Sequence, residues 1–188
     1  MTESTEIQIL KKIKKDKSGS LFFNDSFLSF GNADTIRKAL ERLVKSDEIQ
    51  RVAAGIYVRP EIDPVIGKIT PGIDAVVKAI AKRDKARIVP TGVYALNRLG
   101  LSTQVPMNVV YLTDGAPRKI QIAGRKVTLK KTTPKNVAAV GEISRLVIQA
   151  LREIGKEKTT QHEIEQIQQL LRKEKPTRLE HDFYLAPE

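Results

Sequence analysis

Basic residues recur between Thr35 and Lys45 at a spacing that gathers them on one side of a helix. At about 100° per residue, the apolar side chains fall within an arc of roughly 140°, and they are Ile36, Ala39, Leu40, Leu43 and Val44. The opposite side carries Thr35, Arg37, Lys38, Glu41, Arg42 and Lys45. Arginine can donate two parallel hydrogen bonds to guanine, and arginine and lysine both bind phosphate. The pattern therefore predicts a helix that packs on a core through one side and presents cations to a nucleic acid on the other.

The segments around this helix follow one another in the order of a winged helix-turn-helix. Asn32 is the expected N-cap of the basic helix, and Asp34 lies where the helix dipole favours an anion. The other expected elements are a preceding helix, the strand Leu21–Phe23, a short helix around Asp25–Phe30, and a hairpin of Glu48–Ala53 and Ile56–Arg59. In such modules the second helix of the helix-turn-helix enters the major groove, and the hairpin, or wing, contacts the flanking backbone.

Each polar residue of this region then has an expected contact. Base edges in the major groove are expected to be reached from the exposed side of the helix, by Thr35, Arg37, Lys38 and Arg42. Phosphate contacts, which position a protein without reading the sequence, are expected from Lys45, Arg51 and Arg59. We therefore expect sequence-specific binding to double-stranded DNA.

The composition favours an anionic partner and excludes several kinds of site. The 188-residue chain has a formal net charge of +11, a pI near 9.8 and a hydrophobic fraction of 40%, so it can fill a core and attract phosphate. It has no cysteine, and its two histidines, His162 and His181, lie in different segments, so we expect neither a zinc site nor another cofactor. No apolar run is long enough to span a membrane, and we expect a cytoplasmic protein.

A cluster of prolines at positions 60–71 indicates a boundary between two domains. We assign residues 1–60 to the winged helix-turn-helix, residues 61–70 to a linker and residues 71–188 to a second domain. The patterns in the second domain predict helices at 74–82, 90–99, 142–154 and 161–173, strands at 87–89 and 109–113, and a hairpin of 119–122 and 126–131. The expected fold class is therefore α+β.

Three stretches of the chain carry a resemblance to a known family. They read ALERLVKSDEIQRVAAGIYVRP, RDKARIVPTGVYALNRLGLSTQVP and VVYLTDG. Together they resemble the AbiEi-like antitoxins, transcriptional regulators of bacterial type IV toxin–antitoxin systems in abortive infection, over roughly residues 5–155. The most distinctive matches are Gly55-Ile56-Tyr57, Pro90-Thr91-Gly92 with Tyr94 and Asn97, and Tyr111–Gly115. One departure is Ser46-Asp47-Glu48, where that family usually places a glycine.

The resemblance implies an N-terminal winged helix followed by a small α/β antitoxin domain. Antitoxins of that family typically repress their own operon and counteract a nucleotidyltransferase-like toxin. We therefore expect two partners, DNA from the promoter region of the protein's own gene and a cognate toxin of this kind. The alternative is a protein-binding antitoxin or adaptor that neutralises such a toxin without specific DNA binding.

The most cationic part of the chain lies outside the predicted winged helix. Residues 61–141 carry 14 Lys and Arg against 5 Asp and Glu, whereas residues 1–60 carry 11 against 8. Six cations gather on the second hairpin, and they are Arg118, Lys119, Arg125, Lys126, Lys130 and Lys131. Val127 and Leu129 alternate with the lysines of the second strand, so these lysines are expected on the exposed face. Three interpretations stay open: this secondary basic surface extends the DNA contact, binds an acidic toxin or its nucleic-acid substrate, or is an ordinary solvated surface.

Asp114 follows an apolar strand, which is a common place for the metal-binding carboxylate of an enzyme such as a nuclease, and a nuclease needs a second acid close by. However, residues 85–141 contain no other acidic residue, and Asp-Gly is a typical turn sequence. The chain also lacks a Walker-type glycine loop and a Gly-x-Ser-x-Gly sequence. Thr91 and Asn97 can bond a ligand, but a helix cap or a bond between elements explains them equally well. We therefore do not expect an enzyme.

Overall fold

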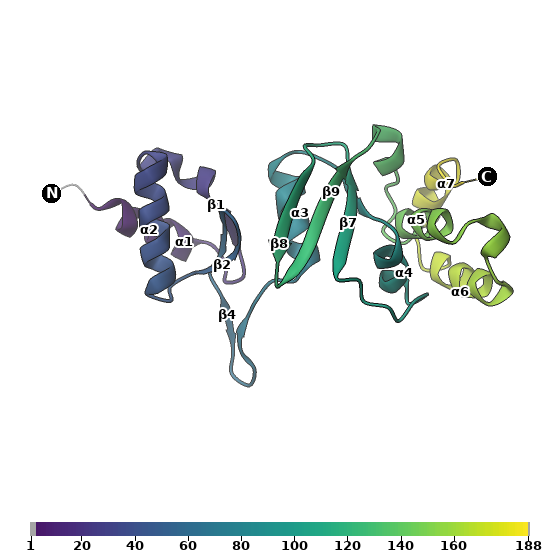
Figure 1. The fold of residues 1–188 in the computed structure, drawn as a ribbon, viewed down its shortest axis with the longest axis horizontal. Coiled ribbons are helices and arrows are strands. Elements are labelled where there is room, and N and C mark those ends of the chain that lie inside the picture. The colour runs from purple at the N-terminus through teal and green to yellow at the C-terminus, as the bar shows by residue number, and fades with distance from the viewer. Residues whose placement is uncertain (1–2, 188) are drawn as a thin grey trace. The chain divides into compact units, whose positions relative to one another are not determined.

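The computed structural model describes residues 3–187 and shows an α+β protein, as predicted (Figure 1). The chain divides into two compact units. The first holds the residues up to Ala79 together with Gln121–Ala123, and the second holds Ile80–Ile120 and the chain from Gly124 onward. No helix within residues 3–187 is both long and apolar enough to cross a lipid bilayer.

The first unit contains every element that the sequence predicts for residues 1–60, with the short middle helix in a 3-10 conformation. The bounds are α1 Thr5–Lys15, β1 Leu21–Phe23, η1 Asn24–Phe30, α2 Ala33–Lys45, β2 Gln50–Ala53 and β3 Ile56–Val58. The three strands form an antiparallel sheet of order β1-β3-β2. Phe22 lies opposite Tyr57, and the register of β2 shifts between Arg51 and Ala53.

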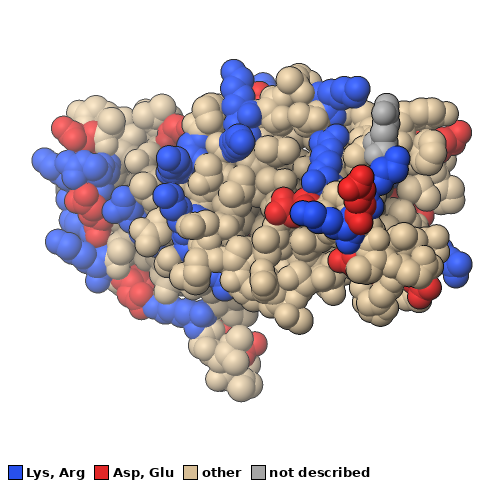
Figure 2. All heavy atoms as spheres, turned by 45° about the vertical axis from the view of Figure 1, so that its right-hand side comes forward, with Lys and Arg blue, Asp and Glu red and all other residues tan. Residues whose placement is uncertain are grey.

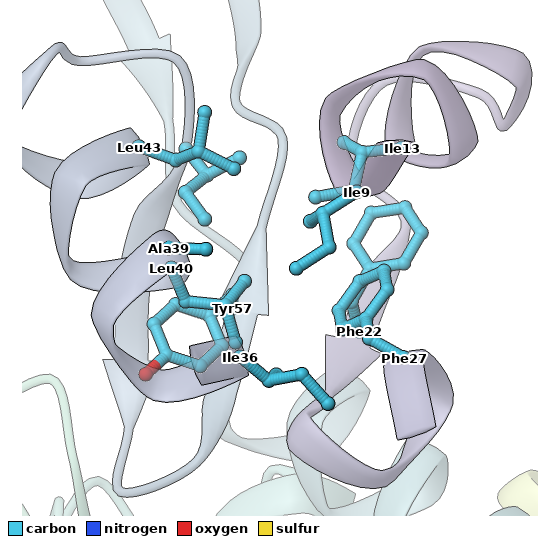
Figure 3. Close-up of a cluster of buried hydrophobic side chains, with 10 residues drawn as sticks. Ile9, Ile13, Phe22, Phe27, Ile36, Ala39, Leu40, Leu43 and Tyr57 are labelled. Atoms are coloured by element: carbon cyan, nitrogen blue, oxygen red, sulfur yellow. The ribbon is translucent and has the colours of Figure 1, made fainter. Parts of the chain in front are cut away.

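Apolar side chains from both helices, η1 and the sheet meet in one core (Figure 3). Its members are Ile9, Ile13, Phe22, Phe27, Ile36, Ala39, Leu40, Leu43, Ile49 and Tyr57. Ile36, Leu40 and Leu43 are at most 2% exposed, which confirms the predicted buried side of α2. Asn32 caps α2 as predicted, since its Oδ1 accepts a hydrogen bond from the Thr35 amide at 2.9 Å. The core thereby fixes which side of α2 faces solvent.

The segment predicted as a linker holds a two-stranded hairpin. In it, β4 Glu61–Asp63 pairs antiparallel with β5 Gly67–Ile69. The Asp63 carboxylate accepts hydrogen bonds from the amides of Ile66 and Val65, at 3.0 and 2.8 Å, and these bonds lower the pKa of Asp63. Asp63 therefore fixes the turn of this hairpin through its own side chain.

The second unit is built around a four-stranded sheet of order β6-β7-β9-β8. The strands are β6 Ile88–Pro90, β7 Asn108–Thr113, β8 Arg118–Ile122 and β9 Arg125–Lys131. β7 is antiparallel to β6 and parallel to β9. The turn of the predicted β8–β9 hairpin is formed by Ala123 and Gly124, with φ of 49° and 77°. Two helices lie between the first unit's strands and β7 in the sequence, α3 Ile73–Arg83 and α4 Val93–Leu99.

Five helical segments follow the sheet. They are η2 Pro134–Val137, α5 Ser144–Ile154, η3 Lys156–Lys158, α6 Gln161–Leu171 and α7 Pro176–Phe183. α5 packs against α4. α6 begins with the predicted capping box, in which Thr160 and Glu163 satisfy each other's amide. α7 is an element that the sequence patterns did not predict.

A buried carboxylate of α7 holds the chain at the start of α5. Asp182 is 1% exposed and accepts hydrogen bonds from the Val140 amide at 2.9 Å, from the Gly141 amide at 2.8 Å and from the Ser144 hydroxyl. Burial alone raises the pKa of a carboxyl group, but hydrogen bonds from Ser144, His181 and these amides outweigh it, so the pKa of Asp182 is lowered. Asp182 is therefore a charged group inside the fold.

Glu174 makes the same kind of contact from the connection between α6 and α7. It is 8% exposed, accepts a hydrogen bond from the Ile143 amide at 2.7 Å, and has a lowered pKa although its burial acts the other way. A Cβ at Gly141 would lie 2.1 Å from the Ser144 hydroxyl and 2.7 Å from the Glu174 carboxylate, so a larger residue there would displace these groups from their hydrogen bonds. Glu174 and Asp182 with the amides that they bind are called the α5 clasp below.

Candidate nucleic-acid interface

The exposed side of α2 carries Arg37 between two acidic side chains. Its guanidinium lies 2.9 Å from Glu41 and 3.4 Å from Asp34. Hydrogen bonding and charge attraction, first to Glu41 and then to Asp34, raise the pKa of Arg37. All three side chains are more than half exposed, and ion pairs of this kind contribute little to stability. A phosphate or a guanine can therefore replace these partners at small cost.

Lys38 and Lys45 are exposed cations of α2 without a carboxylate partner. Within residues 3–187, no ion pair joins either ammonium group to an acidic side chain. The two residues are seven positions apart, which is about two helical turns, so they lie on the same side of α2. None of residues 3–187 neutralises their charge, which remains available to a phosphate.

Arg42 and Arg59 both bind α1 or the segment that follows it. Arg42 forms an ion pair with Glu6 of α1. Arg59 donates hydrogen bonds to the Lys14 carbonyl and to the Ser18 hydroxyl, each at 3.1 Å. These two arginines therefore help to fix α1 in the unit, and a DNA contact from either one requires it to share or exchange these partners.

Thr35 and Arg51 also bond within the first unit. The Thr35 hydroxyl donates to the Asn32 side chain at 2.9 Å, and Arg51 donates to the Ala53 carbonyl at 3.4 Å. Burial raises the pKa of the Tyr57 hydroxyl, and the charge of Arg51 partly opposes this effect. Arg51 is itself exposed, so its charge faces solvent from strand β2.

The seven predicted contact residues thus share one unit, but they differ in what already holds them. The least constrained are Lys38 and Lys45, and Arg37 is held by exposed pairs only. Sequence spacing alone anticipates acidic partners for Arg37, because they lie three residues before and four residues after it. It gives no sign of the pair between Glu6 and Arg42, which are 36 residues apart.

The secondary basic surface follows its predicted alternation. Val127 and Leu129 are 0% and 3% exposed, whereas Lys126 and Lys130 are exposed. Of the other four cations, Lys119 and Lys131 are exposed, Arg125 is half-buried, and Arg118 is half-buried in an ion pair with Asp84. Figure 2 shows Lys and Arg side chains at many places on the visible face, with Asp and Glu between them.

The profile of one protein family matches residues 8–179, which is most of the chain and includes the basic helix. The chain belongs to the DUF6088 family. This family is described as one of unknown function, so membership in it leaves the function to be argued from the residues. No curated protein matches the chain.

In this DUF6088 protein Asp114, the carboxylate considered as a metal ligand, is bound by Arg87. Asp114 accepts hydrogen bonds from the Arg87 amide at 2.7 Å and from its Nε at 2.8 Å. Burial acts in the opposite direction, but these bonds lower the pKa of Asp114. Thr91 and Asn97 both donate hydrogen bonds to other residues of the second unit. Each of these three residues therefore has a structural role.

Asp182 of the α5 clasp also contacts a serine and a histidine side chain, but in an order that does not activate a nucleophile. The Asp182 carboxylate lies between the Ser144 hydroxyl and the His181 ring. A catalytic serine needs the histidine itself to accept its proton, and Ser144 is only 3% exposed. Within residues 3–187, no three His, Cys, Asp or Glu side chains are grouped so as to hold a metal ion.

Proposed function

We propose that this protein is a sequence-specific DNA-binding regulator of transcription with an N-terminal winged helix-turn-helix. The order of elements in the first unit supports this, since α1, β1, η1 and α2 are followed by the β2–β3 hairpin. The sheet order β1-β3-β2 also supports it, because the hairpin joins β1 in one small sheet. In this interpretation α2 is the recognition helix that enters the major groove, and the β2–β3 hairpin is the wing.

The observation that carries the proposal is the division of α2 into an apolar and a cationic side. The apolar side fills the core of the first unit, so the cationic side has to face solvent. On that side Lys38 and Lys45 are unpaired by any of residues 3–187, and Arg37 has only exposed partners. Unpaired cations attract the phosphate backbone, and a weakly held arginine can bond a guanine.

The resemblance to AbiEi-like antitoxins extends the proposal to autoregulation. In this hypothesis the protein binds DNA from its own promoter region, acts in the cytoplasm and neutralises a nucleotidyltransferase-like toxin. The matched residues occupy places where local geometry is demanding, which supports the resemblance. Gly55-Ile56-Tyr57 begins at the turn of the β2–β3 hairpin, where Gly55 has φ of 70°, and Gly92, with φ of 63°, precedes α4.

Fluorescence anisotropy with DNA from upstream of the gene tests the proposal. The protein is titrated into that duplex and into a scrambled duplex, over a series of salt concentrations. We expect tighter binding to the upstream duplex and an affinity that falls steeply as salt rises, because each phosphate contact releases counterions. Equal and weak binding to both duplexes would contradict this function and favour the protein-binding antitoxin.

A charge-reversal variant of the secondary basic surface distinguishes the three interpretations of that surface. A Lys126→Glu, Lys130→Glu variant reverses two exposed charges on β9 and leaves the buried Val127 and Leu129 in place. Loss of affinity for the upstream duplex would assign this surface to DNA. Loss of protection against the toxin, with DNA affinity unchanged, would assign it to the toxin. A variant that behaves like the unmodified protein in both assays would show a solvated surface.

A further inference from the structure

The β4–β5 hairpin exposes an apolar tip. The side chains of Ile62, Val65 and Ile66 are 71%, 89% and 73% exposed. Figure 1 shows the hairpin as a loop that extends away from the sheet of its unit. Neighbouring apolar side chains that remain exposed in this way are typical of an interaction surface. Nothing in the proposed DNA contact uses this tip.

Hydrogen bonds and backbone geometry stabilise the turn at the tip without a partner. The Asp63 carboxylate bonds the amides of both Val65 and Ile66, and Gly67 has φ of +78°, where other residues are strained. At the base of the hairpin, Lys68 forms an ion pair with Asp47. A turn that is already formed loses little conformational entropy on binding, which favours association.

Charge near the tip disfavours DNA as its partner. The hairpin carries Glu61 and Asp63, and its lysine, Lys68, already pairs with Asp47. A groove of about 630 Å³ at the base of the hairpin also includes Glu48 in its lining. The same lining includes Arg59, which donates its hydrogen bonds to the Lys14 carbonyl and the Ser18 hydroxyl. At the hairpin itself, however, a phosphate meets two carboxylates, and the lysine of the hairpin is already paired. The tip therefore fits a protein surface that offers an apolar hollow beside cations.

A hollow of this chemistry lies between the end of α5 and the start of α6. Its volume is about 480 Å³, and its apolar lining includes Leu151, Ile164 and Pro187. The charged side chains of its lining are Arg152 and Lys156, which are both cations. Arg152 donates hydrogen bonds to a side-chain amide oxygen and to a backbone carbonyl, so these bonds leave its charge intact.

We propose that the β4–β5 tip of one copy of this chain binds the α5–α6 hollow of a second copy. Val65 and Ile66 enter the apolar lining, and the carboxylates of the hairpin approach Arg152 and Lys156. Pairing of two tips is disfavoured, because it brings the acidic hairpins of both copies together. The contact is small, so the association is expected to be weak and transient.

The absence of cysteine from the sequence allows a direct test by disulfide trapping. Ile66→Cys and Ile164→Cys are made in separate copies of the full chain, which are mixed without DNA and oxidised. We expect a disulfide between positions 66 and 164 of different copies, because the two thiols meet only when the tip enters the hollow. A Val105→Cys copy, exposed at 55%, replaces the Ile164→Cys copy as the control. The proposal fails if a disulfide between positions 66 and 105 forms as readily as one between positions 66 and 164. It also fails if the main product joins two copies through position 66 of each.

A second variant measures the same contact in solution. Val65→Asp with Ile66→Asp places two charges on the tip, and sedimentation over a range of protein concentrations reports self-association. We expect the dissociation constant to rise at least about tenfold, while Met107→Asp, an apolar side chain exposed at 69%, leaves it unchanged. Equal effects of the two variants, or no association of the unmodified protein at high concentration, would overturn the proposal. Both tests are made without DNA, so their outcome is independent of the proposed function. Weaker DNA binding by the tip variant, with association unchanged, would instead assign the tip to DNA.

Discussion

Residues 5–58 and residues 134–187 handle charged side chains in opposite ways. In the first region the core consists of aliphatic and aromatic side chains, and the cations of α2 face solvent. In the second region two carboxylates, Glu174 and Asp182, lie inside the fold at 8% and 1% exposure. Each of them accepts hydrogen bonds from backbone amides near the start of α5.

The two regions therefore differ in the role of their charges. The cations of the first region are available to a binding partner, whereas the carboxylates of the second region stabilise the fold. An exposed cation such as Lys38, which none of residues 3–187 pairs, adds little to stability, so its charge is free to meet a binding partner. A buried carboxylate such as Asp182 cannot be removed without leaving its donors unsatisfied. The predictions below test this division, beginning with the largest expected effect.

Substitution of Asp182 tests whether the α5 clasp stabilises the second unit. Asp182→Ala leaves the Val140 and Gly141 amides and the Ser144 hydroxyl without their acceptor. We expect the free energy of unfolding to fall by roughly 2–4 kcal/mol, as measured by urea unfolding. Glu180→Ala, an exposed neighbour on α7, is the matched control and should change stability by less than about 0.5 kcal/mol. An equal loss of unfolding free energy in both variants would show that any substitution in α7 destabilises the unit and that the clasp makes no particular contribution.

The lowered pKa of both clasp carboxyl groups predicts that acid loosens the second unit before the first. A group whose pKa is lower in the folded state stabilises the fold above its ordinary pKa, which is 3.8 for Asp182 and 4.5 for Glu174. This stability is lost as the pH falls from about those values through the folded pKa. Hydrogen-exchange protection factors at several pH values should therefore decline for α5 amides while those of α2, whose core holds no carboxylate, persist. Parallel decline of both helices would contradict the comparison.

Substitution of the α2 cations is expected to change stability least. It also tests most directly whether these cations are available to DNA. Lys38→Ala and Lys45→Ala should leave stability within about 0.5 kcal/mol of the original. Lys45→Ala should lower the salt dependence of DNA binding by about one phosphate contact, whereas Lys38→Ala should lower sequence discrimination if Lys38 reaches a base edge as predicted. Arg42→Ala should do the reverse, costing up to about 1 kcal/mol of stability through its pair with Glu6 and affecting DNA affinity less. A larger loss of DNA affinity from Arg42→Ala than from Lys38→Ala would mean that Arg42 reaches a base, as its position on the helix first suggested.

The parts of the fold that the sequence predicted well are those with signals inside one short window. α2 was predicted from the Asn32 cap and the apolar period, and α6 from the capping box at Thr160. The prolines of positions 60–71 predict a linker, whereas the structure has a hairpin at 61–69, for which Asp63 and Gly67 are typical turn residues. α7 has only eight residues, which is too short for an apolar period to stand out.

The candidate site was predictable to the same extent. The exposed cations of α2 and the neighbours of Arg37 follow from helical spacing. The pair between Arg42 and Glu6 and the contacts of Glu174 and Asp182 join residues that are 31 to 42 positions apart. Such contacts depend on tertiary packing, so no local sequence pattern predicts them.

The α5 clasp also affects the order in which the two units can form while the chain is being synthesised. The amides at the start of α5 receive their acceptors from Glu174 and Asp182, which are added 31 to 42 residues later. Residues 5–58, in contrast, contain all of the side chains of their own core. The unit that holds residues 5–58 can therefore fold on the nascent chain, whereas the C-terminal helices can complete their contacts only after residue 182 has left the ribosome.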